Sequence, residues 1–163
     1  MKRILGFVGI LTAMLLGLAG IAHANQPGDF AGNVLHTDIR VYIDDIPIMG
    51  YNIDGSTYVV ATQLNAYGFV VQWNEAARRV DISRGASTAT PLYVQANHES
   101  VGMVAFPFYF TDIVTYVNGQ RVSSFNVGGR TVVRITEVGT AAGVDVQWND
   151  AARTVHVTTD PPL

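Results

Sequence analysis

The sequence contains an internal repeat, in which residues 37–83 return as residues 111–158. Each copy opens with Thr-Asp-Ile and later carries a Gln-Trp-Asn motif, as VVQWNEAAR at residues 70–78 and DVQWNDAAR at residues 145–153. A repeat of this length means that one supersecondary unit is built twice. The recurring positions are apolar, aromatic or turn-forming, and no histidine recurs. The repeat therefore predicts a scaffold and gives little direct evidence of chemistry.

Residues 1–24 have the pattern of an export signal. Lys2 and Arg3 precede an uncharged apolar run, residues 4–21, and Ala22-His23-Ala24 supplies the small-x-small cleavage pattern. The alternative is a membrane anchor, because the run approaches the length that spans a bilayer. The cleavage pattern favours removal after Ala24. We therefore expect a secreted protein with no membrane association after cleavage, and without cysteine it has neither a lipid attachment site nor a disulfide.

The composition suits a small extracytoplasmic module. Residues 25–163 have the size of a single domain, and charged residues make up only 14% of the chain, below the usual quarter. Acidic residues outnumber basic ones, 13 to 10, which argues against binding to nucleic acid. One repeat alone is marginal as a folding unit, so we expect the two copies to share or join their cores.

Each repeat is predicted to form a β-β-β-α-β-β unit, which makes the fold α+β with antiparallel sheets, each packed on a short helix. Short helices are expected at residues 62–67 and 136–142. Gly68 and Gly143 follow them, where a left-handed residue commonly ends a helix. The predicted organisation is a signal peptide (1–24), a first repeat (25–83), a linker with a short strand at 92–95 (84–101), and a second repeat (102–163).

Several motifs occur in a fixed order in the second repeat. A Tyr-Val-Asn-Gly hairpin and a Gly-Gly-Arg-Thr-Val-Val strand precede a short helix that ends in glycine. Val-Gln-Trp-Asn and Ala-Ala-Arg-Thr-Val follow the helix. This succession resembles the copper amine oxidase N-terminal-like domain, also called the stalk domain, which is common in secreted and surface proteins of Gram-positive bacteria. The resemblance covers both repeats and implies a fold more specifically than a function.

The same resemblance places copper chemistry elsewhere. In the oxidases the metal and the quinone cofactor belong to a separate catalytic domain, with three histidine ligands and a tyrosine in an Asn-Tyr-Asp/Glu motif. Here Tyr51 lies between glycine and asparagine, so that motif is absent. His36, His98 and His156 fall in different predicted elements without ligand-like spacing. Adjacent residues such as His98-Glu99-Ser100 do not make a catalytic triad. We expect no metal, no cofactor and no enzymatic activity.

A few side chains remain as candidates for binding or for structure. Trp73 and Trp148 could stack on a sugar ring, but their alternation with valine predicts that they anchor the core. We expect Gly68 and Gly143 to be structural as well. The candidate binding residues are Tyr42, Tyr116, Phe106 and Tyr109. For the tyrosines at 42 and 116, packing between the repeats is favoured over recognition; for the Phe106–Phe110 stretch, burial where the repeats meet is favoured over an exposed aromatic surface.

These expectations favour a secreted, non-catalytic structural or binding module at the bacterial cell surface. Its partner would be a cell-wall polymer or a surface or secreted protein. The second hypothesis is a secreted inhibitor or partner-binding protein that lays its sheet on another protein. A hydrolase is the weakest hypothesis, because no nucleophile–base pair or paired carboxylates emerge from the sequence.

Overall fold

The structure, a computed structural model, describes residues 25–92 and 100–159. The predicted signal peptide lies outside the described residues, and so do His98 and most of the predicted strand at 92–95. Within the described ranges, no helix is long and apolar enough to cross a membrane.

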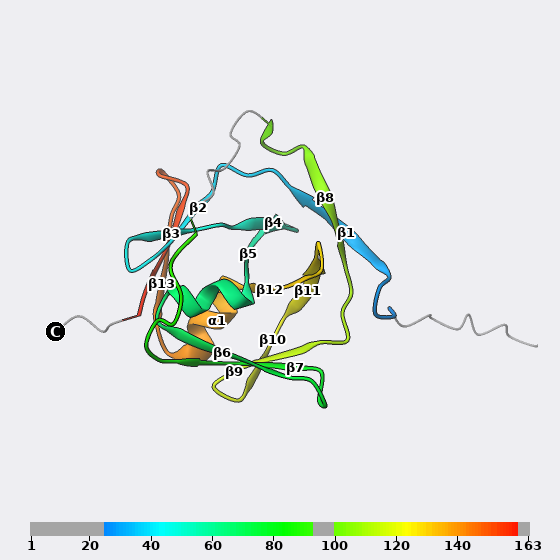
Figure 1. Ribbon diagram of the computed structural model, residues 1–163. Coiled ribbons are helices and arrows are strands. Elements are labelled where there is room, and N and C mark those ends of the chain that lie inside the picture. Colours follow the sequence, from blue (N-terminus) through cyan, green and yellow to red (C-terminus); the bar gives the residue numbers. More distant parts are fainter. Residues whose placement is uncertain (1–24, 93–99, 160–163) are drawn as a thin grey trace, which may run out of the picture.

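The two repeats contain the same succession of elements (Figure 1). The first has β1 (Phe30–Leu35), β2 (Arg40–Ile43), β3 (Ile46–Ile48), β4 (Tyr51–Ile53), β5 (Ser56–Val60), the 3-10 helix η1 (Ala61–Ala66), β6 (Phe69–Asn74) and β7 (Arg79–Arg84). The second has β8 (Val104–Tyr109), β9 (Val114–Val117), β10 (Gln120–Val122), β11 (Ser124–Val127), β12 (Arg130–Arg134), α1 (Ile135–Ala142), β13 (Asp145–Asn149) and β14 (Thr154–Thr158).

Local sequence explains the turns and the helix ends. The β9–β10 turn is Asn118-Gly119 with positive φ at both residues (48° and 80°), as a type I′ hairpin requires. The β2–β3 turn uses two aspartates with positive φ in the same way. Gly68 and Gly143 have φ of 77° and 68° just after the two helices. The predicted helices and their left-handed glycine ends are therefore confirmed.

Six strands form a closed barrel in the order β1-β4-β5-β12-β11-β8. Each repeat supplies three of them. The repeats meet at two antiparallel pairings, β5 with β12 and β1 with β8. In Figure 1, β1 and β8 run side by side along one edge of the molecule. The barrel thus depends on backbone hydrogen bonds between the two copies.

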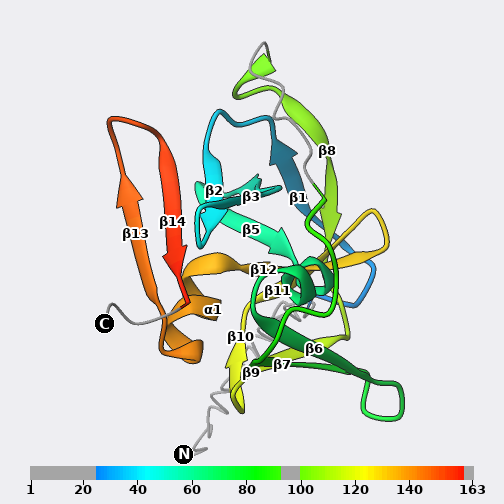
Figure 2. The same ribbon diagram turned by 60° about the vertical axis from the view of Figure 1, so that its left-hand side comes forward.

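The remaining strands form two four-stranded sheets, and each sheet contains one hairpin from each repeat. One has the order β10-β9-β7-β6 and the other β13-β14-β2-β3. Inside each sheet the two hairpins join through a parallel pairing, β7 with β9 and β14 with β2. Figure 2 shows the ends of the β6–β7 and β13–β14 hairpins projecting away from the helices. Each repeat therefore donates a hairpin to the other and receives one.

This arrangement corrects part of the predicted fold class. The structure is mostly β with few helices, and its hairpins are antiparallel as expected. Each four-stranded sheet, however, combines both repeats and includes a parallel pairing, whereas the sequence predicted antiparallel sheets inside each repeat. Five strands precede the helix in each repeat, whereas the predicted β-β-β-α-β-β unit has three. The alternation of apolar and polar residues identifies a strand and its inward face, but it does not identify the strand's partner. Because both copies offer equivalent edges, a strand can pair within its own repeat or with the other repeat.

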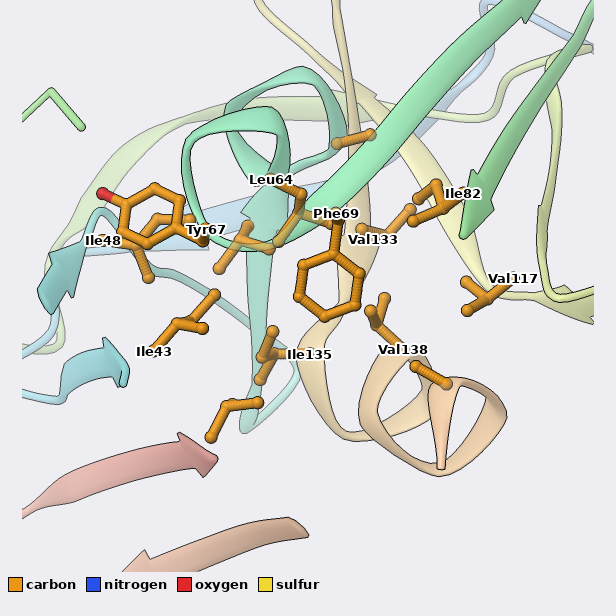
Figure 3. Packing of buried hydrophobic residues seen from close by; sticks show 14 of the residues in the cluster. Ile43, Ile48, Leu64, Tyr67, Phe69, Ile82, Val117, Val133, Ile135 and Val138 are labelled. Carbon is orange, nitrogen blue, oxygen red and sulfur yellow. The ribbon is translucent and has the colours of Figure 1, made fainter. Parts of the chain in front are cut away.

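Two apolar clusters fill the interior. The larger one lies between the two sheets and the helices. Figure 3 shows part of it, with the Phe69 ring near Ile135 and Val138 of α1. The smaller cluster fills the barrel and also draws on both repeats, with Val34, Tyr51, Ile53, Tyr58 and Val60 from the first and Phe108, Val127 and Val132 from the second. Both cores are shared between the copies.

Candidate functional site: two exposed tryptophan–arginine clusters

The hairpin ends at residues 74–79 and 149–154 share one turn geometry. The Asn74 side-chain oxygen accepts a hydrogen bond from the Ala77 backbone N–H at 3.0 Å, and Asn149 accepts one from Ala152 at 3.0 Å. The last turn residue is an arginine with φ of 48° in the first repeat and 51° in the second. The Asn-x-x-Ala-Arg sequence therefore sets the turn, and the turn directs the arginine.

Each of these arginines binds an aspartate of the other repeat. Arg78 donates from Nε to Oδ2 of Asp112 at 2.5 Å and from Nη2 to Oδ1 at 3.0 Å. Arg153 donates from Nε and Nη2 to Oδ1 of Asp38 at 3.0 and 2.9 Å. The backbone oxygen of each arginine also accepts a hydrogen bond at 3.1 Å from a backbone N–H at the start of the paired strand, β9 for Arg78 and β2 for Arg153. We call each Arg–Asp pair, with its backbone hydrogen bond, a clasp.

The clasp changes the titration of the groups that form it. The hydrogen bond from Arg78, together with its positive charge, lowers the pKa of the Asp112 carboxyl below its ordinary value. The same contact raises the pKa of Arg78, and Asp38 raises the pKa of Arg153 in the second clasp. Both arginines are solvent-exposed, so the clasps are surface ion pairs with a bidentate geometry.

A tryptophan lies against each clasp. The guanidinium carbon of Arg78 is 5.7 Å from the Trp73 ring centroid, and that of Arg153 is 5.8 Å from the Trp148 centroid, both within cation–π range. Trp73 also donates from Nε1 to the Glu75 carboxylate at 2.6 Å. The two rings nevertheless remain 45% and 47% exposed.

The prediction that Trp73 and Trp148 anchor the core is therefore wrong. The alternation placed Trp73 on the same strand face as Phe69, which is fully buried. Strand β6, however, continues past the core, and burial decreases along it from Phe69 through Val71 to Trp73. Periodicity reports the face of a strand and contains no information on how far the strand extends beyond the core.

The part of the chain that the structure describes has no candidate metal site. No group of three histidine, aspartate or glutamate side chains there could hold a metal ion. His36 follows β1, and its backbone N–H and C=O bond to Met103 and Gly102, whereas His156 is on β14. His98 lies outside the described residues, so the structure does not assess the histidine–serine pair at 98–100.

The chain matches the model of a known protein family. The family model of the copper amine oxidase N-terminal domain covers residues 38–157. The chain belongs to this family. In copper amine oxidases this domain is a non-catalytic, stalk-like unit. Searches of curated proteins and of solved structures found no match.

In this copper amine oxidase N-terminal domain, the matched region begins at Asp38 and includes Arg153, so it encloses both clasps. Asp38 and Asp112 were not predicted as site residues from the sequence. The signal was present, because the aspartate of Thr-Asp-Ile and the arginine of Ala-Ala-Arg both recur. The threonines of the same motif, Thr37 and Thr111, accept hydrogen bonds at 3.1 Å from the backbone N–H groups two residues later, which shapes the entry into β2 and β9.

The candidate tyrosines of this domain contact the other repeat. Tyr42 stacks on His156 with ring centroids 5.0 Å apart, and the Arg79 guanidinium lies 5.4 Å from the Tyr116 ring. Both tyrosines are half-buried, and their strands pair across the repeat boundary. These contacts favour the packing interpretation of Tyr42 and Tyr116 over recognition.

The aromatic stretch of β8 divides between the interior and the surface. Phe108 is buried where the repeats meet, as expected, and its ring occupies the space beside Gly32. Phe106 is 37% exposed and makes an edge contact with Tyr51 at 5.7 Å. Tyr109 is half-buried and meets Phe30 edge-on at 6.5 Å. Only the outer part of this stretch is available to a ligand.

Proposed function

We propose that this protein is a secreted, non-catalytic module of the bacterial cell surface that binds a cell-wall polymer through Trp73 and Trp148. The observation that carries the proposal is the position of the two indoles. Each is nearly half exposed at the end of a projecting hairpin, and its orientation is fixed by a clasp. Exposed aromatic rings held in place by neighbouring contacts suit stacking on the apolar face of a sugar.

The duplication adds a second argument. The two clusters belong to different sheets, so one chain presents two equivalent binding elements to a repetitive polymer. When two weak sites engage one polymer, the second binding event is intramolecular and overall avidity rises. An overall acidic chain favours contacts to sugar rings over contacts to anionic groups of the polymer.

Intrinsic fluorescence provides a direct test, because the chain has only two tryptophans and both belong to the proposed site. Titration of the mature protein with soluble peptidoglycan fragments should change the indole emission. Trp73→Ala and Trp148→Ala should each weaken retention on purified cell walls, and the double variant should lose it. Phe30→Ala removes an aromatic ring of 60% exposure from β1 and is the matched control. Unchanged retention of the double tryptophan variant would refute the proposal.

A surface or secreted protein is the second candidate partner, and a separate surface favours it. Met103, Val104 and Phe106 expose apolar side chains toward one end of the β1–β8 ribbon, and Phe30 exposes its ring at the other end. Exposed apolar side chains on one ribbon are typical of protein interfaces. Capture from culture supernatant should then depend on Phe30 and Met103 and be insensitive to the tryptophan substitutions.

Both functions require export. The charged start, apolar run and Ala-His-Ala pattern of residues 1–24 support cleavage after Ala24. N-terminal sequencing of secreted material should begin at Asn25. Recovery of an intact species that retains Met1 in the membrane fraction would contradict export by this route.

A further inference from the structure

The pairing between the repeats is symmetric at the level of single residues. In the β5–β12 pairing, Val59 lies opposite Val133, which occupies the same position in the second repeat. On either side, Tyr58 pairs with Arg134 and Val60 with Val132, so equivalent positions exchange partners. Val59 and Val133 therefore lie on a pseudo-two-fold axis that relates the two copies.

The second antiparallel pairing obeys the same symmetry. On β1 and β8, Asn33 lies opposite its own counterpart, Pro107. Gly32 pairs with Phe108 and Val34 with Phe106, again with equivalent positions exchanged. The axis thus passes through both places where the barrel joins the repeats.

The two parallel pairings are images of each other. Arg40 to Ile43 of β2 lie beside Thr154 to Val157 of β14, and Val114 to Val117 of β9 lie beside Arg79 to Ile82 of β7 in the same register. The two clasps follow this register. Taken together, the pairings between the repeats therefore have the geometry of an isologous dimer interface, in which one surface meets a copy of itself.

We propose that a second copy of this chain can replace one repeat, so that two chains form a domain-swapped dimer. In this dimer the first repeat of each chain pairs with the second repeat of the other. The same strand pairings, clasps and cores form as in the single chain, because the partner presents the same residues. The segment between Arg84 and Val104 connects the two repeats of one chain. In the dimer, this segment runs from one folded unit to the other.

The balance between the two forms depends on chain concentration. Both forms contain the same interfaces, so the advantage of the single chain is the effective concentration that the connection provides. Covalent linkage of two binding units typically sets this concentration on the order of 1 mM. Exchange should therefore become substantial when the protein is refolded at, or crowded to, roughly that concentration.

Two cysteine variants test the exchange, because the natural chain contains no cysteine. Tyr42 and His156 are neighbours across the parallel pairing of β2 and β14. One preparation carries Tyr42→Cys and the other His156→Cys, so a disulfide between these positions can form only between chains. The two are unfolded, mixed at roughly 1 mM, refolded under reducing conditions and then oxidised. Tyr42→Cys mixed with Asp81→Cys is the matched control, since these positions belong to one repeat and to different sheets.

The matched mixture should give a disulfide-linked heterodimer, with several-fold less in the control mixture. Light scattering of the cysteine-free mature chain should show a dimer fraction that rises with the refolding concentration. Equal crosslinking in both mixtures, or a monomer at every concentration, would overturn the proposal. Neither result bears on cell-wall binding, because both tryptophans are intact in all of these variants.

Discussion

Arg78 and Asp112, which are 34 residues apart, form a bidentate ion pair that joins the end of one repeat's hairpin to the start of the other repeat's strand. Arg153 and Asp38 repeat the contact across 115 residues. A motif that recurs within each copy therefore acts between the copies. The exchange of hairpins explains why the arginine and the aspartate both recur.

The first prediction concerns the pH dependence of this clasp. The folded state holds the pKa of Asp112 below its value in the unfolded chain. The contribution to stability is therefore complete above the unfolded value, near pH 4, and is lost as the pH falls through the folded pKa. Asp112→Asn should lower the free energy of unfolding at neutral pH, and its difference from the natural chain should shrink below about pH 4.

Urea unfolding between pH 7 and pH 2.5 measures this difference. Asp54→Asn, at an exposed aspartate in the β4–β5 turn, is the matched control. It should show no comparable convergence with the natural chain at low pH. A constant difference between Asp112→Asn and the natural chain across the whole range would contradict the role assigned to the ion pair.

The second prediction compares two aromatic residues of strand β6. Phe69→Ala removes a fully buried ring and should cost about 3–5 kcal/mol. Trp73→Ala removes a larger ring that is nearly half exposed, and it should cost less, about 1–2 kcal/mol. Denaturant unfolding of both variants measures the two losses in the free energy of unfolding. A larger loss for Trp73→Ala would restore the tryptophan to the core and weaken the proposed binding role.

The same residues show which features of the fold are encoded locally in the sequence and which depend on tertiary contacts. Alternation located β6 and its inward face, and the repeat located the equivalent β13, because side-chain period is a local property. The exposure of Trp73 and the partner of Arg78 depend on where the hairpin lies relative to the other copy. Both copies offer the same edges, so no local pattern distinguishes pairing within a repeat from pairing between repeats. The predicted shared core was correct, because that prediction rested on the small size of one repeat and did not depend on which strands pair.

The third prediction concerns the pairing of Gly32 with Phe108 near the pseudo-two-fold axis. A Cβ at position 32 would lie 2.7 Å from Cε1 of Phe108, so the ring would have to move. Gly32→Ala should therefore destabilise the protein by about 1–3 kcal/mol. In the background of Phe108→Leu the same change should cost less. Equal costs in the two backgrounds, measured as a double-mutant cycle, would show that the two residues are not coupled.

The fourth prediction concerns copper. The described residues contain no cluster that could hold a metal, and the family domain is the non-catalytic part of the oxidases. Calorimetric titration of the mature chain with Cu(II) should show at most weak, non-stoichiometric uptake. A tight one-to-one complex that a single substitution, such as His36→Ala or His156→Ala, abolishes would disprove this expectation.

The last prediction uses the pseudo-two-fold axis to measure cooperativity between the repeats. Val59 and Val133 are both fully buried and lie opposite each other, one from each copy. Either valine→Ala change should cost about 1.5–3 kcal/mol, because each removes a comparable buried side chain. Since all sheets and both cores combine the two repeats, either substitution should shift one common unfolding transition. Calorimetry that resolves two transitions, each moved by only one of the substitutions, would mean that the repeats unfold independently. That outcome would also argue against the exchanged hairpins, since a hairpin that completes the other repeat's sheet cannot unfold while that sheet stays intact.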